Sequence, residues 1–146
     1  MAVGDNELLH RSFLPTDVNE EGKLSSTAFN DPQFRPSVDR ALLRPNPKDT
    51  QRTPECGIAQ LLTVEVRAVD SVARMDLPSG DAPEAYRVDV VERPVEPDHD
   101  LGIPANPAHA QIESDPELSN ASRFKRLKEA LSQLANSRDW PIQPKR

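Results

Sequence analysis

The stretch Asn106-Pro107-Ala108-His109-Ala110-Gln111-Ile112-Glu113 joins a rigid turn to a strand signal. Pro104 and Pro107 stiffen the approach, because proline fixes its own backbone φ angle. Apolar and polar residues then alternate with the period of two that is typical of a half-buried strand. We expect Ala108, Ala110 and Ile112 on the buried face, and His109, Gln111 and Glu113 on the polar face. This stretch therefore predicts a strand that carries a histidine and a carboxylate on one polar sheet face.

Other segments with short apolar patterns predict further strands at residues 7–13, 24–29, 58–69 and 86–93. One face of each clear strand is apolar and the other is polar, which is typical of antiparallel sheets. The strands at 58–69 and 86–93 are expected to pair as a hairpin with a long connection. The stretch 36–43 fits a single helical turn and an extended segment equally well.

A helix pattern occupies the C-terminal part of the chain. Asp115-Pro116 resembles an N-cap followed by proline at the first helical position, and Ser122 can cap the helix again after an interruption. Over 123–136, apolar residues recur at spacings of three and four, at Phe124, Leu127, Leu131 and Leu134. We predict an α+β domain, in which a small, mainly antiparallel sheet of about four to six strands carries this amphipathic helix on one face.

The chain has 146 residues, which fits a single domain spanning 1–146. Fifteen prolines against five glycines indicate a stiff, loop-rich molecule. We expect residues 1–6 to be frayed and residues 44–55 and 70–84 to form long loops. The single tryptophan, Trp140, is expected to pin the chain end to the core.

The net charge of −6 is unevenly distributed. Residues 123–146 carry seven Lys or Arg and two acidic residues, or +5, so the remaining 122 residues carry −11. An acidic chain is a poor general ligand of the phosphate backbone of nucleic acids. One cysteine, Cys56, excludes an internal disulfide and a multi-cysteine zinc site. The absence of a signal-peptide pattern and of an apolar run of about 18–20 residues predicts a cytoplasmic protein without membrane contact.

The first candidate site lies in the opening stretch. His109 and Glu113 share a strand face but lie about 13 Å apart along it, so they could flank a ligand without touching. An ordinary solvated sheet face is the alternative interpretation. Asp98-His99-Asp100 together with His109 offers metal-ligand types but no fixed-spacing motif, and we predict neither a metal nor a cofactor. A P-loop, a dinucleotide fingerprint and a G-x-S-x-G motif are all missing from the sequence.

The second candidate site is spread over the chain. His10 and Arg11 lie in the first predicted strand, Ser25-Ser26-Thr27 in the second, and Glu113 late in the chain. This order resembles that of ADP-ribosyltransferase-like folds, and Gln111-Ile112-Glu113 reads as Gln-x-Glu, although the Arg-Gly and full Ser-Thr-Ser motifs are missing. The resemblance implies that the first group holds a nicotinamide nucleotide, the Ser/Thr strand supports the pocket and the glutamate directs the nucleophile. The candidate catalytic residues are therefore His10, Arg11, Ser26, His109 and Glu113.

A broader resemblance covers nearly the whole chain. It rests on a Leu-x-x-x-x-Phe-x-Pro opening with a basic centre that ends at Phe13-Leu14-Pro15, and on a terminal helix that closes on Trp140-Pro141. Between them lie Leu24-Ser25-Ser26-Thr27-Ala28-Phe29, Pro36-Ser37-Val38-Asp39-Arg40 and Asn106-Pro107-Ala108-His109-Ala110. With these motifs the sequence resembles a group of short uncharacterised bacterial proteins. The resemblance implies no activity, but it favours the view that the motifs belong to one surface.

Three functions follow as hypotheses, and the sequence leaves open whether the protein is an enzyme. The first is a small bacterial accessory protein of the immunity, antitoxin or defence-system type, which binds a protein partner through its polar sheet face and proline-rich loops. The alternative is an enzyme acting on a nucleotide or nucleic acid at His10, Arg11, Ser26, His109 and Glu113. The third, less favoured because of the net charge, is nucleic-acid binding through Arg123, Lys125, Arg126 and Lys128.

Overall fold

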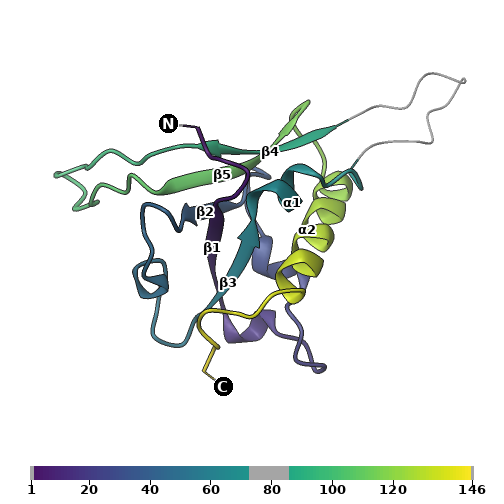
Figure 1. The fold of residues 1–146 in the computed structure, drawn as a ribbon, viewed down its shortest axis with the longest axis horizontal. Helices are drawn as coiled ribbons and strands as arrows, with labels where there is room; N and C mark the ends of the chain where they lie inside the picture. The colour runs from purple at the N-terminus through teal and green to yellow at the C-terminus, as the bar shows by residue number, and fades with distance from the viewer. Residues whose placement is uncertain (1, 73–85, 146) are drawn as a thin grey trace, which may run out of the picture.

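The computed structural model describes residues 2–72 and 86–145, and its centre is a five-stranded sheet (Figure 1). The strands are β1 (Leu8–Phe13), β2 (Ser37–Arg40), β3 (Gly57–Leu62), β4 (Arg87–Glu92) and β5 (His109–Asp115). Their order in the sheet is β3-β1-β2-β5-β4, and every neighbouring pair is antiparallel. β5, the strand predicted from the opening stretch, pairs with β2 on one side and β4 on the other.

One face of the sheet carries the hydrophobic core. Helix α2 (Ala121–Asn136) packs there, and its side chains Phe124, Leu127 and Leu131 are buried with Leu9 and Ile112 of the strands. Trp140 packs edge-on against Phe13, with ring centroids 5.0 Å apart. The predicted α+β domain with a C-terminal helix on one sheet face is thereby confirmed. No helix in the described part of the chain is long and apolar enough to cross a membrane.

The predicted strand at 58–69 is wrong in its second half. β3 ends at Leu62, and Thr63–Arg67 form the short helix α1. The backbone N–H and the hydroxyl of Thr63 both donate to the carbonyl of Glu7, at 3.0 and 2.8 Å. The N–H of Val64 donates to the carbonyl of Asp5. The N-terminal segment thus supplies hydrogen-bond partners that turn the chain, and these long-range partners override the β preference of the valines.

The expected hairpin between 58–69 and 86–93 is also wrong, because β3 and β4 lie at opposite edges of the sheet (Figure 1). β1 occupies the position next to β3, with Leu9 opposite Leu61. β4 pairs instead with β5, with Val90 opposite Ile112. The predicted loop at 70–84 falls largely on residues 73–85, which lie outside the described residues.

The structure differs from, or decides between, the predictions for residues 24–29, for residues 36–43 and for the start of the C-terminal helix. Residues 26–29 form the short 3-10 helix η2 (Ser26–Phe29) rather than a strand, because Ala28 and Phe29 reach the core and the N–H of Asn30 bonds back to Thr27. The ambiguous stretch 36–43 is extended as β2. Helix α2 begins at Ala121, and the side chain of Asn120 caps it by accepting from the N–H of Arg123. The predicted caps at Asp115 and Ser122 are therefore wrong.

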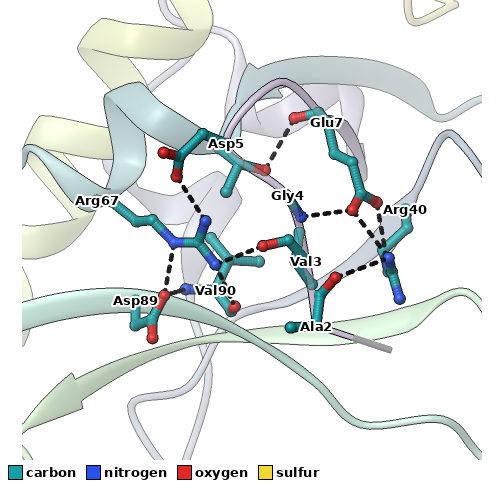
Figure 2. A network of polar contacts seen from close by, with 10 residues as sticks. Ala2, Val3, Gly4, Asp5, Glu7, Arg40, Arg67, Asp89 and Val90 are labelled. Atoms are coloured by element: carbon teal, nitrogen blue, oxygen red, sulfur yellow. Dashed lines mark hydrogen bonds and ion pairs between the residues drawn. The ribbon is translucent and has the colours of Figure 1, made fainter.

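Two arginines hold the N-terminal segment (Figure 2). Arg40, whose side chain is almost fully buried, donates from Nε and Nη2 to both carboxylate oxygens of Glu7, at 2.7 and 2.8 Å, and from Nη2 to the carbonyl of Ala2. This pairing lowers the pKa of the Glu7 carboxyl. The expected fraying of residues 1–6 is not seen for residues 2–6.

Arg67 of α1 makes the second set of contacts with this segment. Its guanidinium bonds Asp5 at 2.6 Å, Asp89 at 2.7 Å and the carbonyls of Val3 and Val90 (Figure 2). The N–H of Val90 is bonded by the carboxylate of Asp89. Because β4 is an edge strand, these contacts also occupy backbone groups that would otherwise be open to pairing with another chain.

We predict that Glu7→Gln destabilises the protein by about 3 kcal/mol at pH 7, because it removes one partner of a buried ion pair. Urea unfolding measures the loss, and Glu20→Gln, at an exposed turn, is the matched control. The folded-state pKa of Glu7 lies below its ordinary value of 4.5. The contribution of Glu7 is therefore complete above that value and is lost as the pH falls through the folded-state pKa. An equal loss in both variants would contradict the role of the pair.

Candidate functional site

A row of polar side chains crosses the sheet face that is opposite to α2. Gln60 of β3 lies opposite His10 of β1, His10 opposite Asp39 of β2, and Asp39 opposite His109 of β5. Directly opposed residues of antiparallel strands point to the same face. Their sequence neighbours, such as Leu9 and Val38, face the core. The register therefore places two histidines and a carboxylate side by side on one surface.

His10, Asp39 and His109 of this row form the floor of a cleft of about 210 Å³. Two segments form the walls of the cleft. One is the loop of residues 41–56 (the 41–56 loop), and the other is the hairpin of residues 93–108 (the 93–108 hairpin). The lining residues are His10, Arg11, Ser12, Ser37, Val38, Asp39, Thr50, Arg52, Asn106 and His109. Pockets for drug-sized ligands measure about 300–1,000 Å³. This cleft therefore suits one small polar group rather than a whole cofactor.

The buried carboxylate of Asp39 joins the two walls. Its Oδ2 accepts hydrogen bonds from the hydroxyl of Thr50 at 2.8 Å and from Nη1 of Arg44 at 3.1 Å, both in the 41–56 loop. Its Oδ1 accepts from the side-chain amide of Asn106 in the 93–108 hairpin, at 2.9 Å. A buried carboxylate needs such partners, since an unpaired one would be costly. Asp39 thus positions both walls over the floor of the cleft.

Further bonds stiffen each wall. The N–H of Arg52 donates to the hydroxyl of Ser12 at 3.2 Å, and Asn46 caps the short 3-10 helix η3 (Pro47–Asp49). In the hairpin, the side-chain oxygen of Asn106 also accepts from the N–H of Ala108 at 3.1 Å. Asn106 therefore links the turn, the start of β5 and Asp39.

His109 lies at the hairpin side of the cleft. Its Nδ1 is 2.7 Å from the carbonyl oxygen of Arg93. A carbonyl only accepts hydrogen bonds, so Nδ1 carries a proton, and Nε2 has the lone pair when the ring is neutral. Among residues 2–72 and 86–145, nothing is seen to bond Nε2. The Nε2 of His109 is therefore available to hydrogen-bond a bound group.

His10 lies deeper, with 4% of its surface exposed. Its Nδ1 is buried and has no hydrogen-bond partner within the described residues. Burial lowers the pKa of His10, and a hydrogen bond with Gln60 and the charge of Asp39 partly oppose this effect. His10 is therefore neutral near pH 7, and a buried ring nitrogen without a partner is unusual.

Two arginines border the cleft in different ways. Arg11 lies on the core side of β1, where its guanidinium donates to the carbonyls of Ala28, Ser37 and Asn30 at 2.9, 2.7 and 3.1 Å. Burial, and next to it the positive charge of Arg52, lowers the pKa of Arg11 to about 10. The Arg52 side chain is exposed, and in the described ranges no acceptor or carboxylate bonds its guanidinium.

The structure brings together only part of the predicted catalytic set. His10 and His109 share the cleft, whereas Arg11 reaches it from the strand and directs its guanidinium toward η2. Ser26 lies in η2, on the α2 side of the sheet. Glu113 forms a two-point ion pair with Arg93, at 2.8 and 3.0 Å, and does not line the cleft. The arrangement implied by the ADP-ribosyltransferase-like resemblance therefore does not form one pocket.

The predicted partner-binding residues on α2 lie away from this cleft. Lys128 donates to the side chain of Asn30 at 2.7 Å and lies over the ring of Phe124. Arg126 lines a separate cavity between α1 and α2, while Lys125 is exposed. Arg123 is half-buried. The four residues thus have different environments and do not form one uniform basic face.

Metal ligands are not grouped in the described residues: no set of three or more His, Cys, Asp or Glu there could hold a metal ion. The carboxylate of Asp98 instead accepts from the N–H groups of Asp100 and Leu101, which shapes the hairpin tip.

Seven lining residues of the cleft were not among the predicted site residues: Ser12, Ser37, Val38, Asp39, Thr50, Arg52 and Asn106. Asn106 opens the stretch 106–113 that predicts a strand, and Asp39 belongs to the alternating Ser37-Val38-Asp39-Arg40. An acidic residue at a strand position beside an apolar one was the available signal for Asp39. Thr50 and Arg52 gave none, because their loop has no periodicity.

Comparisons of the chain with protein-family models, with curated proteins and with solved structures found no match. The grounds for a function are therefore the geometry and charge of the cleft and its walls.

We predict that Asp39→Ala loosens both walls at once and destabilises the protein by about 2–4 kcal/mol, because it leaves three half-buried donors without their acceptor. Hydrogen exchange should increase in both the 41–56 loop and the 93–108 hairpin. Thr50→Val should loosen only the loop, and Asn106→Ala only the hairpin. Asp49→Ala, at an exposed carboxylate of η3, is the control. Faster exchange in only one wall of Asp39→Ala would show that Asp39 does not couple them.

Proposed function

We propose that the protein is a small accessory protein, of the immunity, antitoxin or defence-system type, that binds a protein partner with the face formed by the cleft and its two walls. The observation that carries this proposal is the attachment of both proline-rich walls to buried Asp39. A surface that is ordered before binding loses less conformational entropy when the partner arrives. The walls are therefore suited to recognition of a defined surface.

The distribution of exposed apolar side chains supports a protein partner. Four of the six large hydrophobic side chains that are exposed in the described residues belong to the two walls. Leu42 and Leu43 lie in the 41–56 loop, and Leu101 and Ile103 at the hairpin tip. Apolar side chains around a polar centre can exclude water from an interface. The net charge of −6 disfavours nucleic acid as the partner.

We predict that a photo-crosslinking amino acid placed at Leu101 or at Leu42 captures the same protein in the native host. The same probe at Glu20, an exposed position outside both walls, is the control and should not capture it. With the isolated partner, Leu101→Asp should weaken binding at least about tenfold, because a charge would then be buried at the interface. Capture that is equal at all three positions, or binding unchanged by Leu101→Asp, would refute the proposal.

A second candidate function, an enzyme acting on a nucleotide or nucleic acid, is favoured by one observation. His10 and His109 share the cleft on either side of Asp39, and histidine is the side chain most often used for general acid–base chemistry. This version uses neither Ser26 nor Glu113.

For the enzyme candidate, we predict that purified protein converts a short RNA or a nicotinamide nucleotide, and that His109→Gln lowers the rate by about 100-fold or more. Chromatography of the products measures the conversion. His99→Gln, at an exposed histidine of the hairpin, is the matched control and should leave the rate unchanged. Equal rates in both variants would assign the conversion to a contaminant.

A further inference from the structure

The cleft has a positive local charge in an otherwise acidic protein. Arg11, Arg44 and Arg52 lie at or beside it, and Asp39 is the carboxylate among its lining residues. Among the lining residues themselves, Arg11 and Arg52 against Asp39 leave a net charge of +1, whereas the whole chain has −6. A concentrated charge of one sign in a recess attracts ligands of the opposite sign.

The charges are also incompletely compensated. The guanidinium of Arg11 is bonded by three backbone carbonyls and by no carboxylate among the described residues. Asp17 and Asp31 act on it only from a distance, and their effect is smaller than those of burial and of Arg52. Arg11 and Arg52 therefore repel each other across the floor of the cleft. An anion between Arg52 and the floor would relieve this repulsion.

The polar groups that face the cleft can bond such an anion. The guanidinium of Arg52 has its donors available, and the hydroxyls of Ser12 and Ser37 belong to the lining. The carboxylate of Asp39 competes little with the anion for these donors, because its two oxygens already accept three hydrogen bonds from other groups. The buried Nδ1 of His10, which has no partner within residues 2–72 and 86–145, is a further donor at the floor when the neutral ring carries its proton there. Arginine with hydroxyl donors is a usual setting for phosphate and carboxylate groups.

We infer that the cleft is a binding site for one oxyanion, a phosphate or carboxylate group, which a phosphorylated or acidic side chain of the protein partner inserts between the two walls. The identity of the partner's group rests on the proposed function, but the anion site itself does not. The volume of about 210 Å³ admits the charged group alone, so the remainder of the ligand lies outside, against the walls. The exposed Leu42 and Leu101 then contact the surface around the inserted group.

The anion site is tested by titrating the full chain with inorganic phosphate at constant ionic strength, while NMR records the backbone amides and the His109 ring. Saturable shifts confined to the residues of the cleft are expected. Arg52→Gln should weaken phosphate binding at least tenfold, and Arg126→Gln, which removes the same charge from α2, should leave it unchanged. Shifts scattered over the surface, or equal weakening in both variants, would overturn the site.

A second measurement identifies the source of the group. N-acetylphosphoserine amide and adenosine monophosphate are titrated in parallel, and the phosphoserine probe should bind at least as tightly. Tighter binding of the nucleotide by tenfold or more would overturn the assignment to a protein side chain and assign the site to nucleotides.

Crosslinking through a probe at Leu101 in the Arg52→Gln variant separates the two proposals. The yield of crosslinked partner should fall, because this variant has lost phosphate binding. If phosphate binds in the cleft but no partner is captured, the proposed function fails and the anion site stands. If a partner is captured equally well from Arg52→Gln, the anion site has no part in recognition.

Discussion

The carboxylate of Asp39 is the contact on which the candidate site depends. It is buried in the middle of the sheet and would be unstable there without partners. The partners come from two segments far apart in sequence, the 41–56 loop and the 93–108 hairpin. Satisfying one buried charge therefore determines where both walls lie. The prolines of these segments stiffen the chain, but they do not by themselves determine where the segments lie on the sheet.

Asp39 and Arg40 are neighbours in β2 but contact different parts of the protein, because successive side chains point to opposite faces of a strand. Asp39 points into the cleft and holds its walls, while Arg40 points to the core side and holds Glu7 and the N-terminal segment (Figure 2). The N-terminal segment in turn supplies the carbonyls of Asp5 and Glu7 that end β3 and begin α1. One strand of four residues thus connects the site to the edge of the fold.

Most regular elements could be predicted from local patterns, because burial of one face leaves a period in the sequence. The alternation of 106–113 correctly placed β5, and the spacing of Phe124, Leu127 and Leu131 correctly placed the core-facing side of α2. The errors have a common physical origin. Val64 and Val66 continue an alternating pattern, but the hydrogen bonds offered by a distant segment form a helix there instead. Strand neighbours likewise depend on long-range pairing, which no local period records.

The candidate site shows the same division. By itself, the sequence determined that His109 lies on the polar face of a strand after a rigid turn, because proline restricts the backbone and a strand has a period of two. It could not determine that His10 and His109 flank the same aspartate, since that follows from the order β1-β2-β5 and the register of three strands. Nor could it show that Ser26 and Glu113 lie elsewhere, or that Thr50 and Arg52 belong to the cleft. These points follow from the folded chain alone, because a buried charge takes its partners from residues that are close in space, whatever their distance along the sequence.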